Sequence, residues 1–168
     1  KAVEQAKQMV SLFQEQAAFS AGEAVAQEML AQAYFFKAQV AMGETQEEDG
    51  GEDEKPLTKA LLAAQEARLH YENLENASAK ANEAKLYLKI AQIESAQEDH
   101  HKALASAERA QSIAQELSSS ELEGIALQVQ VKALHDSNDL KAAMGKATEC
   151  MNLYQDQGLQ PQAGLAML

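Results

Sequence analysis

The chain is poor in cysteine and in aromatic residues, which stabilise small folds or take part in chemistry in many proteins. It has no tryptophan, aromatic residues make up 5% of it, and Cys150 is its single cysteine. One cysteine excludes an internal disulfide, and an unpaired thiol is typical of a reducing compartment, so we expect a cytoplasmic, intracellular protein. The two prolines, Pro56 and Pro161, leave long stretches free to be helical.

Positive charge is also scarce. The chain has 14 Lys and Arg residues against 26 Asp and Glu residues, a formal net charge of −12 and a pI of about 4.7. Binding to nucleic acid needs a basic face, and anionic membrane surfaces repel acidic proteins. No apolar run approaches the roughly 20 residues of a membrane span. The sequence therefore predicts neither a nucleic-acid partner nor a membrane partner.

Small apolar residues, many of them alanine, recur at helical spacing through most of the chain. Together with polar boundary clusters, this spacing predicts seven helices, over residues 1–16, 21–42, 57–75, 79–97, 100–117, 121–135 and 140–157. Ser20, Ser78 and Ser120 each stand where a helix is expected to begin, and we interpret them as caps, two of them (Ser20 and Ser120) in capping boxes. The pattern favours an all-α protein.

Residues 44–55 break this pattern. They hold seven acidic residues and one base, Lys55, around Gly50-Gly51. Self-repulsion and glycine predict a disordered acidic insertion, and Pro56 then suits the first turn of the next helix. Two roles stay open for the insertion: a solvated linker, or a docking segment for a basic partner.

A repeat of 40 residues organises the second half of the chain. Asp99, Ala103, Ala107, Ala110 and Ile113 recur as Asp139, Ala143, Ala147, Cys150 and Leu153. A fixed period of this size is typical of stacked helical hairpins, so we expect one repeat domain over residues 1–168. Because the chain begins at Lys1, without Met and inside a repeat, we also expect it to be a fragment of a longer array.

These residues resemble a tetratricopeptide repeat array. The second helix of such a repeat carries small residues at the spacing seen in Ala103/Ala107/Ala110, Ala143/Ala147/Cys150, Ala60/Ala64/Ala67 and, more loosely, Ala2/Ala6/Met9. The period is similar to the lengthened repeats of kinesin light chains and several signalling scaffolds. The chain departs from the family pattern in lacking its tryptophan, and in having Glu98 and Asn138 where a glycine usually precedes the turn. The resemblance implies an α-solenoid of antiparallel helix hairpins that curves as a right-handed superhelix.

The resemblance also implies a concave groove lined by the first helix of each hairpin. The groove residues that we expect to bind a partner are Lys37, Lys85, Leu88, Gln92, Gln128, Lys132 and His135. We place Lys37, Gln92 and Lys132 at one register position, where a line of Lys and Gln suits a peptide backbone or carboxylate. The alternative is that these are ordinary solvated side chains.

No catalytic constellation is visible. His100-His101 lies next to Asp99 at an expected helix start, but a metal site would need a further ligand placed by the fold. Cys150 occupies a small-residue core position with no neighbouring base, which favours inert packing. We therefore predict no catalytic residue, no metal and no cofactor, and a protein that is not an enzyme.

The predicted function is a protein–protein interaction module that binds a peptide or helix of another protein in its groove. Two alternatives remain. The chain is a structural spacer or oligomerisation segment of a larger solenoid, with self-association through exposed repeat ends, or it is a regulatory domain fused to an enzyme.

Overall fold

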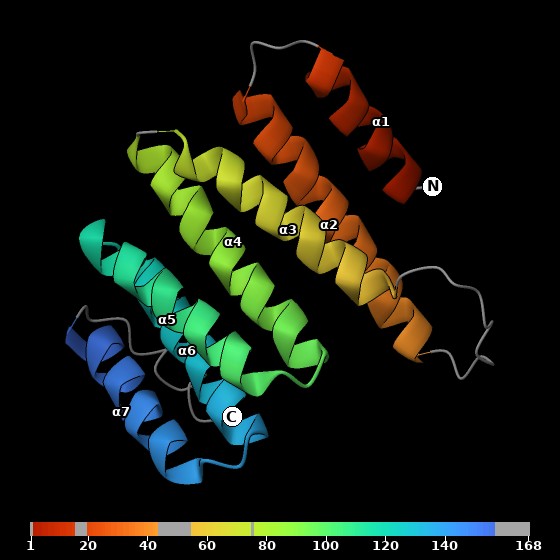
Figure 1. The fold of residues 1–168 in the computed structure, drawn as a ribbon. Helices are drawn as coiled ribbons and strands as arrows, with labels where there is room; N and C mark the ends of the chain where they lie inside the picture. Colours follow the sequence, from red (N-terminus) through yellow and green to blue (C-terminus); the bar gives the residue numbers. More distant parts are fainter. Residues whose placement is uncertain (1, 16–19, 44–54, 75, 157–168) are drawn as a thin grey trace. The chain divides into compact units, whose positions relative to one another are not determined.

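The computed structural model describes residues 2–15, 20–43, 55–74 and 76–156, and over these ranges the chain is helical with no strand (Figure 1). The helices are α1 (Ala2–Glu15), α2 (Ser20–Gly43), α3 (Pro56–Glu72), α4 (Ala77–Ala96), α5 (His100–Glu116), α6 (Ser120–Asp136) and α7 (Leu140–Asp156). The predicted all-α class is confirmed. Of the acidic insertion, only Lys55 falls within the described residues.

The chain divides into two compact units, Lys1–Ala79 and Lys80–Leu168. In the first unit α2 packs against both α1 and α3, and in the second α6 packs against both α5 and α7. Helices that follow one another in sequence are therefore neighbours within each unit. The expectation that all 168 residues form one right-handed solenoid domain stays a prediction.

The turns of the second unit repeat every 20 residues. Three residues adopt the left-handed conformation, with φ of 64° at Glu98, 51° at Ser118 and 64° at Asn138. At the first of these turns, the Glu98 amide donates to the Ser95 carbonyl at 3.0 Å and the Asp99 amide to the Glu94 carbonyl at 2.9 Å. The other two turns have the same pair of bonds. This geometry ends one helix and begins the next within three residues. The turn therefore occurs twice in each 40-residue repeat, once after each helix.

The helix caps lie one or two residues from the predicted serines. Ser119, rather than Ser120, caps α6, and its hydroxyl accepts from the Leu122 amide at 3.5 Å. At α4, Asn76 accepts from the Ala79 amide at 2.8 Å, so Ser78 lies inside the helix. The left-handed turn explains why the cap of α6 is Ser119 and not Ser120. Ser118 has the positive φ, so the next residue occupies the N-cap position.

Alanine makes the core of both units. In α5, Ala103, Ala107 and Ala110 are at most 1% exposed and pack against alanine and leucine side chains of α4 and α6. In α3, the buried positions include Ala60, Ala64, and Ala67. A methyl side chain lets two helix backbones approach closely, so the repeated alanines mark the packing faces as the sequence predicts.

Candidate functional site

In the second unit, α4 contacts α6, which is the first helix of the next hairpin. The Ser95 hydroxyl of α4 donates to the Asp136 carboxylate of α6 at 3.5 Å, and these residues are 41 positions apart. Leu88 of α4 joins Ala126 of α6 in a buried cluster completed by Ala110 of α5. The first helices of these two hairpins are therefore in contact.

Four of the predicted groove residues are exposed on these two helices. They are Lys85 and Gln92 of α4, and Lys132 and His135 of α6. Gln128 is half-buried, and its amide donates to the Tyr154 hydroxyl at 3.3 Å. The His135 ring lies 3.3 Å from the Asp136 carboxylate.

Two of the predicted groove residues lie elsewhere. Leu88 is 6% exposed and belongs to the core, so its side chain is not open to a partner. Lys37 is exposed on α2, in the first unit. The structure thus groups the α4 and α6 residues, without Leu88, and does not group Lys37 with them.

The contacts of two tyrosines give Lys37 a different register from Lys132. The Tyr71 hydroxyl donates to the Glu28 carboxylate at 3.5 Å in the first unit, and Tyr154 makes the matching contact with Gln128. These paired contacts align Glu28 with Gln128, so Lys132 corresponds to residue 32. The insertion and the 24-residue length of α2 hide this register from sequence analysis.

The charges of α4 are sorted by sign. Its two glutamates, Glu83 and Glu94, are 7% and 6% exposed, whereas Lys80, Lys85 and Lys89 are exposed or half-buried. Lys80 pairs with Glu116 at 3.0 Å. In a chain of net charge −12, the exposed charged residues of this helix are therefore lysines, and one of them, Lys80, is paired.

Burial changes the chemistry of Glu94. Desolvation raises the pKa of its carboxyl, and the negative charge of Asp99 acts in the same direction. A hydrogen bond from the Ser106 hydroxyl, 2.7 Å long, opposes this pKa shift together with the charge of Lys102. The carboxyl is thus held in the core by one short bond and is more easily protonated than an exposed glutamate.

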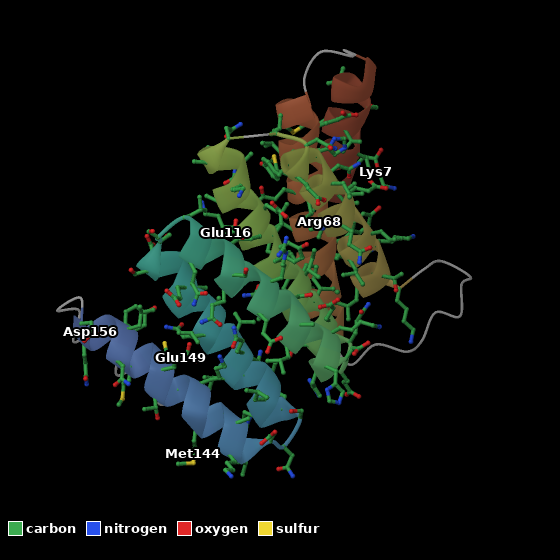
Figure 2. All side chains as sticks on the ribbon, turned by 60° about the vertical axis from the view of Figure 1, so that its left-hand side comes forward. Lys7, Arg68, Glu116, Met144, Glu149 and Asp156 are labelled. Carbon is green, nitrogen blue, oxygen red and sulfur yellow. The ribbon has the colours of Figure 1, made fainter. Side chains whose placement is uncertain are left out.

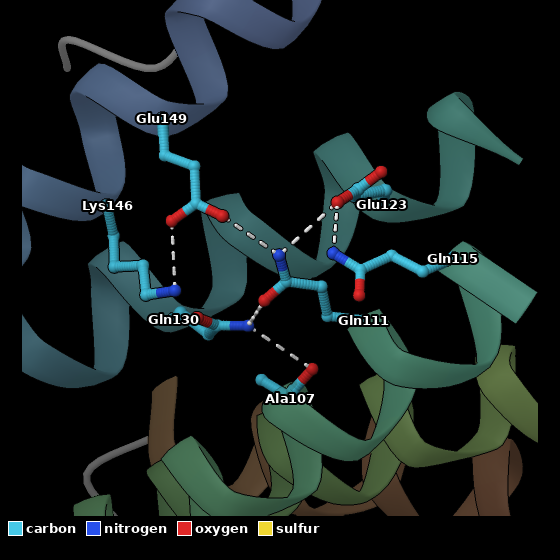
Figure 3. Close-up of polar contacts among 7 residues, drawn as sticks. All are labelled: Ala107, Gln111, Gln115, Glu123, Gln130, Lys146 and Glu149. Atoms are coloured by element: carbon cyan, nitrogen blue, oxygen red, sulfur yellow. Dashed lines mark hydrogen bonds and ion pairs between the residues drawn. The ribbon is translucent and has the colours of Figure 1, made fainter. Parts of the chain in front are cut away.

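A buried polar network that sequence analysis missed joins α5, α6 and α7 (Figure 3). Gln130, fully buried, donates to the Gln111 side-chain oxygen at 2.8 Å and more weakly to the Ala107 carbonyl at 3.5 Å. The Gln111 amide nitrogen donates in turn to Glu149 at 3.1 Å and Glu123 at 3.4 Å. The sequence carries no local signal for this network, because Gln111 and Gln130 lie 19 positions apart.

The two carboxylates fix the direction of this network. They accept hydrogen bonds only, so Gln111 turns its nitrogen toward them and its oxygen toward Gln130. Gln115 and Lys146 also donate to them, at 2.6 Å and 3.0 Å. The remaining oxygen of Gln130 is buried without a hydrogen-bond partner. The network is a specific but incompletely satisfied link between three helices.

Cys150 is fully buried and its Sγ donates to the Gly124 carbonyl at 3.6 Å. Burial raises the pKa of this thiol, with a hydrogen bond from Gln128 opposing the shift, so the thiol stays protonated. His100 and His101 begin α5 beside Asp99. Within the described part of the chain, no His, Cys, Asp and Glu side chains are grouped to hold a metal ion.

No helix in the described ranges is long and apolar enough to span a bilayer. No protein-family model matches the chain, and no curated protein matches its sequence.

Proposed function

We propose that the second unit is a protein-interaction module that binds an acidic peptide segment of another protein across α4 and α6. The observation that carries this proposal is the charge sorting on α4, where Lys80 and Lys85 are exposed, Lys89 is half-buried and both glutamates are buried. Lys132 adds a positive charge from the neighbouring helix α6. Burying two carboxylates while leaving the lysines outside gives an acidic chain a local basic surface, which attracts acidic partners.

The same surface offers an apolar contact and hydrogen-bonding groups. Ile125 of α6 is 37% exposed one turn from Gln128, and Gln92 is exposed on α4. Apolar side chains supply most of the affinity of such interfaces, whereas charges set the rate of association and the choice of partner. An extended or helical segment with acidic side chains around one apolar residue fits these features.

A displayed library of random peptides, selected on the 168-residue protein, tests the proposal. The tightest peptides should be acidic, and fluorescence anisotropy should show an affinity that falls as salt rises. The double variant Lys85→Glu/Lys132→Glu should weaken binding at least tenfold. Lys141→Glu is the control, because Lys141 is also exposed but lies on α7. Equal losses in both variants, or selected peptides without acidic residues, would overturn the proposal.

A second role, self-association, is favoured by a separate observation. Leu140 and Met144 are 52% and 72% exposed on α7, and Met144 is labelled on that helix in Figure 2. Large apolar side chains exposed one turn apart are typical of a surface that another helix covers.

A further inference from the structure

One face of α7 corresponds, by the 40-residue period, to a face of α5 that packs against α6. Through the 40-residue period, Met144, Ala147 and Met151 of α7 match Leu104, Ala107 and Gln111 of α5. On α5 these positions pack against α6: Ala107 is fully buried and Gln111 is 8% exposed. On α7, Ala147 is half-buried, Met151 is half-buried against the Leu127, Cys150 and Tyr154 cluster, and Met144 is exposed. The α7 face is thus more apolar than its counterpart and yet less covered.

We propose that this face of α7, formed by Leu140, Met144, Ala147 and Met151, binds the same face of a second copy of this chain. The spacing of the four residues is self-complementary. When two such helices run antiparallel about a twofold axis, Leu140 faces Met151 of the second copy and Met144 faces Ala147. Each large side chain at the centre then meets a small one, as interdigitating helices require.

The charges of α7 favour a second copy over a charged partner. Lys141 and Lys146 balance Glu149 and Asp156, so the helix has no net charge although the chain carries −12. Lys146 and Glu149 already pair with each other at 3.0 Å. Two acidic chains repel each other over most of their surfaces, and a helix without net charge adds no repulsion of its own where they meet.

Analytical ultracentrifugation over a range of concentrations tests the proposal. The 168-residue protein should sediment as a dimer at high concentration. Met144→Glu should raise the dimer dissociation constant at least tenfold, because it places a carboxylate at the centre of the interface. Met144 is exposed, so the variant should keep its helical circular dichroism and its melting temperature.

Gly145→Glu is the matched control. It adds the same charge one residue away, where an added Cβ meets open space, and it lies on another side of α7. This variant should still form the dimer. A wild-type protein that stays monomeric at all concentrations would overturn the proposal, and so would a dimer that both variants weaken equally. Peptide binding on α4 and α6 is measured separately, so either proposal can fail without the other.

Discussion

Gly124 of α6 and Tyr154 of α7 share one space in the core. A Cβ built on Gly124 would overlap the ring and hydroxyl of Tyr154, which is 3% exposed. The corresponding pair one repeat earlier is Ala84 and Ala114, both fully buried in one cluster. The two hairpins therefore fill the same position with different volumes, glycine with tyrosine in one and two alanines in the other.

This relationship predicts that Gly124→Ala destabilises the protein although alanine is the better helix former. Alanine gains about 1 kcal/mol of helix propensity over glycine. Overlap with a buried aromatic ring costs about 1–3 kcal/mol or more, because the ring cannot leave its site without opening a cavity. We expect a net loss in the free energy of unfolding, measured by urea denaturation. Gly145→Ala is the control and should stabilise, since nothing lies within 4 Å of its added Cβ.

A double-mutant cycle tests the same pair from the other side. Tyr154→Ala alone should cost about 3–5 kcal/mol, as large-to-small changes of buried aromatic residues do. Gly124→Ala/Tyr154→Ala rebuilds the alanine pair of the preceding hairpin, so it should cost clearly less than the two single changes added together. Simple additivity would show that the two residues do not constrain each other.

The left-handed turns predict how glycine substitutions at these positions change the free energy of unfolding. Glu98 and Ser118 have positive φ, which costs a residue with a side chain about 1–2 kcal/mol, whereas asparagine tolerates this conformation. Glu98→Gly and Ser118→Gly should each raise the free energy of unfolding, by about 1 kcal/mol after the entropy of glycine is counted. Asn138→Gly should change it much less. Equal effects at Glu98 and Asn138 would contradict the argument, and thermal melting of the three variants decides it.

The regular part of the fold was predictable because it depends on spacing. The alanines of α5 fixed both the helix and its packing face. The repeat of Asp99 at Asp139 was visible in the sequence, but the capping of α5 and α7 by these two residues was not predicted. The caps at Asn76 and Ser119 were missed by one or two residues, since several polar residues compete at each boundary. Backbone geometry, such as the positive φ of Ser118, decides among them and leaves little trace in one sequence.

The candidate site was harder to predict. Exposure of Lys85 and Lys132 followed from helical periodicity, but the burial of Leu88 depends on how closely Ala110 and Ala126 approach. The register of Lys37 depended on the length of an insertion, so only the contact of Tyr71 with Glu28 revealed it. The buried Gln111–Gln130 contact joins residues 19 positions apart, and no local pattern predicts such a pair.

This buried amide pair supplies a third prediction. Gln130→Leu removes the donor to Gln111 and leaves the Gln111 oxygen unpaired in the core. A buried polar group without a partner costs about 1–3 kcal/mol. Gln111→Leu/Gln130→Leu removes both amides, including the oxygen of Gln130 that has no partner, so it should destabilise less than the sum of the single changes. Urea denaturation of the three variants measures the coupling, and a double variant as unstable as the sum would contradict it.

The buried carboxyl of Glu94 supplies the last prediction, in the pH dependence of stability. Burial raises its pKa in the folded protein above the ordinary value of 4.5, so the folded state binds the proton more tightly than the unfolded state. Stability contributed at Glu94 is then greatest at low pH and is lost as pH rises from about 4.5 through the folded-state pKa.

Glu94→Gln keeps an oxygen that accepts from Ser106 but removes the charge, so its stability relative to wild type should grow over this pH range. Ser106→Ala should make the wild-type loss steeper, because it removes the hydrogen bond that stabilises the charged form. Urea denaturation at a series of pH values measures all three proteins, and a constant difference between Glu94→Gln and wild type would show that the carboxyl is ionised in the core at no cost.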